Sequence, residues 1–143
     1  MNELIPRYGE TTLLNGELIT AIELTWPGSH GAFVKFRRSA LESTIVGVAV
    51  ALDINQGICV SARIALGNYS TAPIRAKDAE AELLGTALDP SDVAAATAAL
   101  DALDPVGDRQ ASAGYRHRLT RVLLGQAIDQ ALGAPTSAVE ATA

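Results

Sequence analysis

Two apolar segments joined by a short turn constrain the fold of this chain more than any other feature of its sequence. Residues 45–52 are apolar at every position, which is typical of a strand covered on both faces, although a buried helix has the same pattern. Residues 58–66 are apolar at alternate positions, which predicts a strand with one buried face. The turn between them, residues 53–57 with the sequence Asp-Ile-Asn-Gln-Gly, makes an antiparallel hairpin the simplest interpretation.

The residues before this hairpin predict two further strands. Residues 17–25 alternate between two kinds of side chain, which is typical of a half-buried strand. One side carries Leu18, Thr20, Ile22 and Leu24, and the other carries Glu17 and Glu23. Pro27 and Gly28 end this strand, because both residues interrupt the ladder of backbone hydrogen bonds. Residues 32–38 predict a second strand that leads into the hairpin.

Three helices are predicted after the strands. Residues 76–84 form the first, which ends at Gly85. The second begins with Asp89 as its cap and Pro90 as its first residue, and it runs to about residue 103. The third follows Ser112 as a possible cap and ends at Gly133. Its apolar stripe at helical spacing consists of Tyr115, Leu119, Val122, Leu123, Ile128 and Leu132.

Strands followed by helices indicate an α+β domain, with a three- to four-stranded antiparallel sheet and three helices packed on one face. We expect residues 1–13 to form an N-terminal arm or linker, residues 14–133 to form the domain, and residues 134–143 to form a disordered tail. The other face of such a sheet needs a cover. We therefore expect it to dock a second protein or a second copy of the chain.

Composition and charge exclude several classes of protein. The net charge of −5 argues against a nucleic-acid binder, which needs a basic face to neutralise phosphates. The single cysteine cannot form an internal disulfide and suits a reducing compartment. No segment reaches the roughly 20 apolar residues that span a bilayer, and the first residues do not form a signal peptide. We therefore expect a cytoplasmic protein without a membrane partner.

Two basic clusters are the candidates for function. The first consists of Lys35, Arg37 and Arg38. It has two interpretations: a solvated strand end, or a group that faces an anionic or electron-rich cofactor. The second consists of Tyr115, Arg116, Arg118 and Arg121. Because Arg118 and Arg121 are three residues apart, they share a helix face, which is either solvated or a docking surface for a negatively charged partner.

Catalytic and metal-binding motifs are not found in the sequence. His30, His117 and Cys59 are isolated, and no spacing indicates a metal site. No serine lies in a nucleophile elbow, and no glycine-rich loop could cradle phosphates. We therefore assign no catalytic residue and no metal ligand.

The order of several short motifs resembles one protein family. The motifs are Phe-x-Lys-x-Arg-Arg-Ser-Ala-Leu-Glu at residues 33–42, Ala-Arg-Ile-Ala-Leu-Gly at 62–67, Pro-Ile-Arg-Ala at 73–76 and Ser-Ala-Gly-Tyr-Arg at 112–116. Together they are similar to the C-terminal domain of the FAD-binding (medium) flavoprotein subunits of molybdenum hydroxylases, including carbon monoxide dehydrogenases and xanthine dehydrogenase-like enzymes. The resemblance runs from about residue 14 to residue 132.

This resemblance implies a fold, a cofactor and partners. It implies the same strands-then-helices domain, in a complex where electrons pass from molybdenum and iron–sulfur centres to FAD. The domain would close the FAD site and contact the molybdopterin and iron–sulfur subunits, with a homodimer as a further possibility. FAD would be held only together with a partner FAD-binding domain or subunit, and the chain alone would not be catalytic. The alternative is a non-catalytic protein-interaction module that kept the fold but lost flavin binding.

The resemblance also implies a role for the first basic cluster. In the family, the matching residues lie on the face that closes against the flavin ring, so Lys35, Arg37 and Arg38 are the expected cofactor-binding residues. This sequence lacks one residue between the lysine and the arginine pair. Because neighbouring residues of a strand point to opposite faces, only one of the two arginines can face the flavin. We favour Arg38, since Arg38-Ser39-Ala40-Leu41 matches the family without the missing position.

Overall fold

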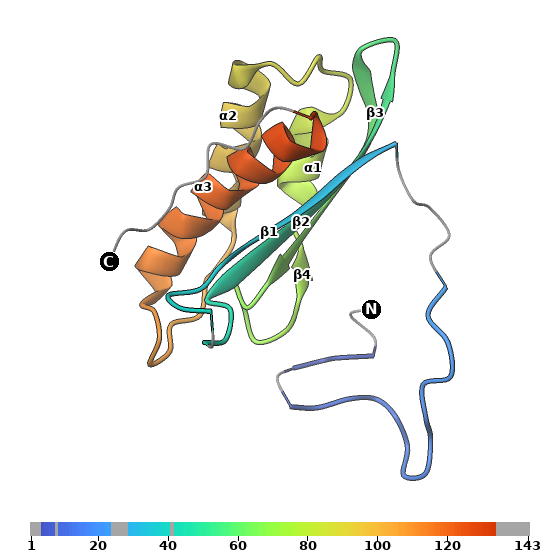
Figure 1. Ribbon diagram of the computed structural model, residues 1–143, viewed down its shortest axis with the longest axis vertical. Coiled ribbons are helices and arrows are strands. Elements are labelled where there is room, and N and C mark those ends of the chain that lie inside the picture. Colours follow the sequence, from blue (N-terminus) through green and yellow to red (C-terminus); the bar gives the residue numbers. More distant parts are fainter. Residues whose placement is uncertain (1–3, 8, 24–28, 41, 134–143) are drawn as a thin grey trace.

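The protein folds into one four-stranded antiparallel sheet with three helices on one face, as the sequence predicts (Figure 1). The structure is a computed structural model that describes residues 4–7, 9–23, 29–40 and 42–133. The strands are β1 (His30–Phe36), β2 (Val46–Asn55), β3 (Ile58–Gly67) and β4 (Ile74–Arg75). They pair in the order β1-β2-β3-β4, so each strand lies beside its neighbour in sequence.

The predicted hairpin between β2 and β3 is confirmed. Its two turn residues, Gln56 and Gly57, have φ values of 51° and 79°. Positive φ at both central residues is the backbone geometry that matches the right-handed twist of a two-residue hairpin. Glycine adopts this geometry without strain, which explains its place at the end of the turn.

The long apolar run is buried on one face only, so the predicted cover on both faces is wrong. Val46, Val48, Val50 and Leu52 point toward the helices and are buried. The intervening residues of β2 are Gly47, Ala49, Ala51 and Asp53. Residues this small can look like part of a fully buried run in the sequence. In the described chain, the helices lie on the opposite side of the sheet from them (Figure 1).

A bulge changes the face of β3 near the hairpin turn. Asp53 pairs with Ser61, and Ile54 pairs with Cys59, so Val60 has no partner across the strand. Ala62, Ile64 and Leu66 are buried as predicted. Before the bulge the order is reversed: Cys59 is buried, while Ile58 and Val60 are exposed. The predicted burial of Ile58 and Val60 is therefore wrong.

The helices are α1 (Lys77–Leu83), α2 (Pro90–Ala99) and α3 (Ala113–Ala131), and a short 3₁₀ helix, η1 (Leu100–Ala102), continues α2. Each predicted cap is confirmed. The Asp89 carboxylate accepts hydrogen bonds from the backbone N–H groups of Ser91 (2.8 Å) and Asp92 (3.1 Å), and the Asp92 carboxylate accepts one from the N–H of Asp89 (3.0 Å). This reciprocal arrangement is a capping box. Ser112 accepts from the N–H of Tyr115 at 3.3 Å.

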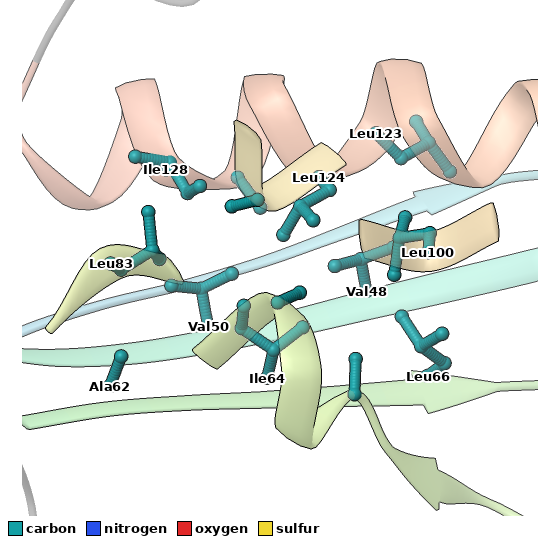
Figure 2. Packing of buried hydrophobic residues seen from close by; sticks show 14 of the residues in the cluster. Val48, Val50, Ala62, Ile64, Leu66, Leu83, Leu100, Leu123, Leu124 and Ile128 are labelled. Carbon is teal, nitrogen blue, oxygen red and sulfur yellow. The ribbon is translucent and has the colours of Figure 1, made fainter. Parts of the chain in front are cut away.

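The core lies between the helices and the covered face of the sheet (Figure 2). It contains Val48, Val50, Ala62, Ile64 and Leu66 from the strands and Leu83, Leu100, Leu123, Leu124 and Ile128 from the helices. Helix α3 crosses β1 and β2, and α1 lies over β3. The large side chains of β2 from Val46 to Leu52 therefore point to the helices, and the residues between them on the other face are small.

The buried face of α3 differs from the predicted stripe. Leu123 and Ile128 are buried and Leu119 is half-buried, but Tyr115, Val122 and Leu132 are exposed. The inward positions at the start of the helix belong to Arg116 and Thr120, which are buried. The Thr120 hydroxyl donates to the carbonyl of Arg116 at 2.8 Å, and the Arg116 guanidinium donates to Asp108 and to the carbonyl of Val106. Polar residues at these positions obscured the periodicity.

The predicted strand over residues 17–25 does not form in its described part. Residues 17–23 have no regular secondary structure and are exposed. Leu24, Pro27 and Gly28 lie outside the described residues, as does the predicted disordered tail at residues 134–143. No helix in the described ranges has the length and apolar character needed to cross a membrane.

Candidate functional site

The uncovered face of the sheet carries a group of very small residues. These residues belong to β2 and β3, and residues of β1 lie in register beside them: Lys35 with Gly47 and Gly67, and Phe33 with Ala49 and Ala65. We call this surface the platform and define it by Gly47, Ala49, Ala51, Ala65 and Gly67. A surface without long side chains can accept a planar ring system or a flat partner surface.

A single aromatic ring lies across one part of the platform. Phe33 is 60% exposed although it is a large apolar residue in a strand. A Cβ atom added to Gly47 would lie 3.1 Å from Cε2 and 3.2 Å from Cζ of Phe33. The ring therefore covers the place where any other residue would have its side chain. At Gly67 the surface stays open, since an added Cβ would approach only the carbonyl oxygen of Gly47, at 3.9 Å.

Lys35 is the member of the first basic cluster that lies on the uncovered face. It follows Phe33 at the next outward position of β1, and its side chain makes no hydrogen bond or ion pair with another described residue. Arg63 lies on the same face of β3 and is exposed. The ammonium group and the guanidinium group give this apolar surface a positively charged border, although the whole chain is acidic.

The two arginines of the cluster lie beyond the end of β1 and have other partners. Arg37 donates from Nη1 to the carbonyl of Ala40 at 3.0 Å. Arg38 forms an exposed ion pair with Glu42, with 3.0 Å between Nε and Oε2. The structure therefore does not gather Lys35, Arg37 and Arg38 into one constellation. Their contact with a flavin remains a prediction.

Arg38 also borders a polar hollow beside the start of α3. A concavity of about 470 Å³ is lined by Arg38, Asp108, Arg109 and Gln110. An adjoining pocket of about 460 Å³ is formed by the loops that precede β2, follow β3 and precede α3. Hydrogen bonds tie these loops together, from Asn68 to the carbonyl of Thr44 (2.6 Å) and from Gln110 to the Ser43 hydroxyl (2.6 Å).

The second basic cluster is divided between the interior and the surface. Arg116 is only 3% exposed, and it donates from Nη2 to Asp108 at 2.8 Å and from Nη1 to the carbonyl of Val106. Its hydrogen bond holds the pKa of Asp108 below the ordinary value. Tyr115 and Arg118 are exposed. Arg116 therefore has a structural role, and the cluster does not form one docking surface.

The remaining member, Arg121, takes part in a polar network on the surface of α3. It pairs with Asp101 of η1 at 3.0 Å, and His117 approaches the same carboxylate, with 2.9 Å between Nε2 and Oδ1. The Nδ1 atom of His117 lies 2.8 Å from the hydroxyl of buried Tyr69. Burial raises the pKa of Tyr69, and the contact with His117 lowers the pKa of Asp101. The network ties η1 to α3.

Sequence reasoning missed the platform, although a signal for it exists. Residues 46–52 read Val-Gly-Val-Ala-Val-Ala-Leu, so large and small residues alternate strictly. A scale that scores glycine, alanine and valine alike as apolar hides this alternation. Side-chain volume reveals it, and the exposed partner Phe33 follows from the same register.

The sequence matches a described family and longer proteins. Residues 31–131 match the CO dehydrogenase flavoprotein C-terminal domain. The carbon monoxide dehydrogenase medium chain of Afipia carboxidovorans is 36% identical over 124 residues, which covers 85% of this chain and 43% of that protein. The 6-hydroxypseudooxynicotine dehydrogenase complex subunit alpha of Paenarthrobacter nicotinovorans is 39% identical over 140 residues, which covers 92% of this chain and 46% of that protein.

A solved structure extends the likeness to three dimensions. A chain in the crystal structure of the cyanide-inactivated form of the Cu,Mo-CO dehydrogenase superposes with a TM-score of 0.82 and 30% identity. The superposition covers 92% of this chain and 47% of that one. The chain therefore spans less than half the length of these three relatives.

Proposed function

The chain belongs to the CO dehydrogenase flavoprotein C-terminal domain family, and we propose that it serves as this domain in the flavoprotein subunit of a molybdenum hydroxylase complex. In this role it closes the FAD site and contacts the other subunits while electrons pass from molybdenum and iron–sulfur centres to FAD. The family match and the names of the relatives support the proposal, since one is a CO dehydrogenase medium chain and another is a subunit of a dehydrogenase complex.

The observation that carries this proposal is the uncovered platform. The Gly and Ala residues of β2 and β3 leave this surface without long side chains, and Phe33 and Lys35 of β1 stand beside them. The open space at Gly67 fits a flat ring, since an added Cβ there meets only one atom within 4 Å. An apolar surface of this kind would be covered in a working assembly. The residues present therefore fit one side of a flavin site.

The basic cluster would act on the flavin through its charge. When FAD is bound, its ring supplies the site that accepts and releases electrons. A positive charge fixed near the ring stabilises the negative charge of the reduced form without reorganisation of solvent. We keep Lys35, Arg37 and Arg38 as the proposed group. Lys35 has the freest side chain of the three, because Arg38 is ion-paired with Glu42 and Arg37 bonds a carbonyl.

FAD binding would require a second flavin-binding part, in the same chain or in another. The pyrophosphate of FAD needs a cradle of backbone N–H groups, which glycine-rich loops at helix starts provide. In the described residues, the starts of α2 and α3 are closed by their own caps, Asp89 and Ser112. We therefore propose that the isolated chain is colourless and binds FAD weakly or not at all.

The test is reconstitution with the missing part. The chain is co-expressed with the part of the Paenarthrobacter subunit alpha that lies outside their match, and the complex is assayed for bound FAD and for its reduction potential. Lys35→Ala, Arg37→Ala and Arg38→Ala are compared with Lys77→Ala, which removes a charge from α1 on the helical side of the sheet. We expect at least one of the first three to make the potential more negative, and Lys77→Ala to leave it unchanged.

Two results would count against the proposal. If the chain alone purifies with stoichiometric flavin, the proposal that FAD binding requires a second flavin-binding part is wrong. If the complex forms but all four variants have the same potential, the basic cluster is a solvated strand end and the chain is better described as an interaction module.

A further inference from the structure

The N-terminal arm, which we define as residues 9–23, exposes apolar side chains that nothing in the described chain covers. Leu18 is 84% exposed and Ile22 is 76% exposed, and Leu14 and Ile19 are also exposed. Figure 1 shows the arm, in blue, running away from the sheet and the helices. Scattered exposed apolar residues are ordinary on protein surfaces, but four in one short segment indicate a surface that is covered in use.

The backbone of the arm makes few hydrogen bonds in the described chain, and none in its last six residues. Its hydrogen bonds are local, from the N–H of Thr12 to the carbonyl of Leu4 (3.0 Å) and from the N–H of Glu17 to the carbonyl of Leu14 (3.0 Å). Residues 18–23 make no hydrogen bond with any described residue. A strand taken out of its sheet would have these properties, since its N–H and C=O groups need partners that another strand supplies.

The sequence of the arm is that of a strand. Leu18, Thr20 and Ile22 share one side of an extended chain, and Ile19 and Ala21 lie between them on the other. Ile19, Thr20 and Ile22 are β-branched, which favours strands over helices. The strand predicted here fails to form in the described chain, although its local preferences support it. What the predicted strand lacks in the described chain is a neighbouring strand to pair with.

One comparison includes residues 17–23 of the arm in the region shared with a longer relative. The family match starts at residue 31 and leaves the arm out. The match to the Paenarthrobacter subunit alpha covers 92% of this chain, which leaves too few residues outside it for 17–23 to be excluded. That subunit is more than twice as long as its matched part. The arm is therefore retained in a protein that has a further large part for it to contact.

We propose that residues 17–23 add as a β-strand to a sheet in the flavin-binding part of the flavoprotein subunit, whether that part belongs to the same chain or to another. This inference rests on the proposed function. Backbone hydrogen bonds would give the addition its register, and Leu18 and Ile22 would enter the partner's apolar core. This chain would thus supply one strand of a sheet that otherwise belongs to the flavin-binding part.

A second copy of the chain is the competing partner. The outer edge of β1 has no neighbouring strand in the described sheet, because β1 pairs only with β2. An arm from a second molecule could therefore add there. The two possibilities differ in their dependence on concentration and on the flavin-binding part, so a single set of measurements distinguishes them.

The experiment uses the 143-residue chain, free and co-expressed with the part of the Paenarthrobacter subunit alpha outside the match. Hydrogen exchange is measured at the backbone amides of residues 17–23. Three variants are compared: Ile22→Asp places a charge in the proposed contact, Ala21→Pro removes a backbone donor but no large side chain, and Val122→Asp is a control at an exposed apolar site on α3. Because residues 18–23 are exposed and make no hydrogen bond with the described part of the domain, the thermal midpoints of the two arm variants should equal that of the wild type.

The expected result is fast exchange in the free chain and at least tenfold slower exchange in the complex. Ile22→Asp and Ala21→Pro should each weaken the complex at least tenfold, and Val122→Asp should not. A complex that forms with an unprotected arm and tolerates both arm variants overturns the inference and leaves the proposed function standing. Tolerance of Ala21→Pro alone overturns strand addition in favour of simple apolar contact.

Two further outcomes would also be decisive. Protection of the arm in the free chain that grows with concentration assigns the arm to a second copy and overturns the inference. If the wild-type chain forms no complex at all, both the inference and the proposed function fail.

Discussion

Arg75 and Glu80 form a two-point ion pair that joins β4 to α1. Arg75 donates from Nε to Oε1 at 2.5 Å and from Nη2 to Oε2 at 2.6 Å. The same carboxylate accepts a hydrogen bond from the backbone N–H of Ile64 in β3 at 2.8 Å. The pairing raises the pKa of Arg75, so this guanidinium stays charged. One buried carboxylate therefore fastens the first helix and the last strand to the middle of the sheet.

Removing this carboxylate should destabilise the domain. Glu80→Gln keeps the size of the side chain but loses the charge-assisted hydrogen bonds and weakens the acceptor for Ile64. We expect a loss of about 1–3 kcal/mol in the free energy of unfolding, with the lower part of that range reflecting the partial exposure of Arg75. Urea unfolding provides the measurement. The control is Glu82→Gln, an exposed change in the same helix, and equal effects of the two would contradict the role of the pair.

The pair of Arg116 and Asp108 should make the stability of the domain depend on pH in the acid range. Because Arg116 holds the pKa of Asp108 below its ordinary value of about 3.9, the ionised carboxylate contributes stability above that pH. This contribution is lost as the pH falls through the lower folded-state pKa. Asp108→Asn should lower the urea midpoint at pH 7 and make the midpoint less sensitive to acid below about pH 4. Asp129→Asn, at an exposed site near the end of α3, is the control.

Cys59 should be unreactive in the folded protein. Its thiol is fully buried and donates to the carbonyl of Ser61 at 3.4 Å, and burial raises its pKa. Reaction with a disulfide reagent then requires opening of the core. We expect labelling at neutral pH to be at least about a hundredfold slower than in 8 M urea, since only open molecules react. Rapid labelling of the native chain would show that the hairpin end of β3 opens locally.

The two faces of the sheet should respond differently to truncation. Leu66→Ala creates a cavity in the core between β3 and the helices, and we expect a cost of about 2–5 kcal/mol. Phe33→Ala removes a larger side chain from the uncovered face, where it is mostly exposed. We expect it to cost less than about 1 kcal/mol in the isolated chain. Chemical unfolding of both variants checks this, and a large effect of Phe33→Ala would mean that the ring stabilises the sheet itself.

Local signals predicted most of the elements correctly. Asp89, Pro90 and Ser112 mark helix starts through hydrogen bonds within one turn of chain, so the sequence alone contains the whole interaction. The turn at Gln56 and Gly57 is local in the same sense. The family resemblance implied the same order of strands and helices. These features depend little on what the rest of the molecule does.

Features that depend on distant partners were not predictable from local patterns. The bulge opposite Ile54 reverses the burial of Cys59 and Val60, and no turn residue marks it. The buried position of Arg116 depends on Asp108 and on the carbonyl of Val106, which approach it from another loop. Residues 17–23 have the pattern of a strand but lie alone in the described chain.

The candidate site was predicted in part. Lys35 lies on the uncovered face, which the sequence analysis expected to dock a partner. Its neighbours there are small residues of β2 and β3, and no sequence motif identified them. The expectation that Lys35, Arg37 and Arg38 act together depended on strand geometry continuing past Phe36. The chain leaves the strand at that residue, so alternation no longer sets the directions of the two arginines.

The order of the strands has a consequence for how quickly the domain forms. Because each strand pairs with its neighbour in sequence, the sheet can assemble through closures of short loops, which cost little chain entropy. Helix α3 must return from the far end of the chain to reach β1 and β2, so its docking is a long-range closure that we expect to follow formation of the sheet. We expect Leu124→Ala to accelerate unfolding while leaving the refolding rate nearly unchanged, and Val50→Ala to slow refolding. Stopped-flow measurements in urea separate the two, and they would identify the hairpin of β2 and β3 as the nucleus on which the last helix closes.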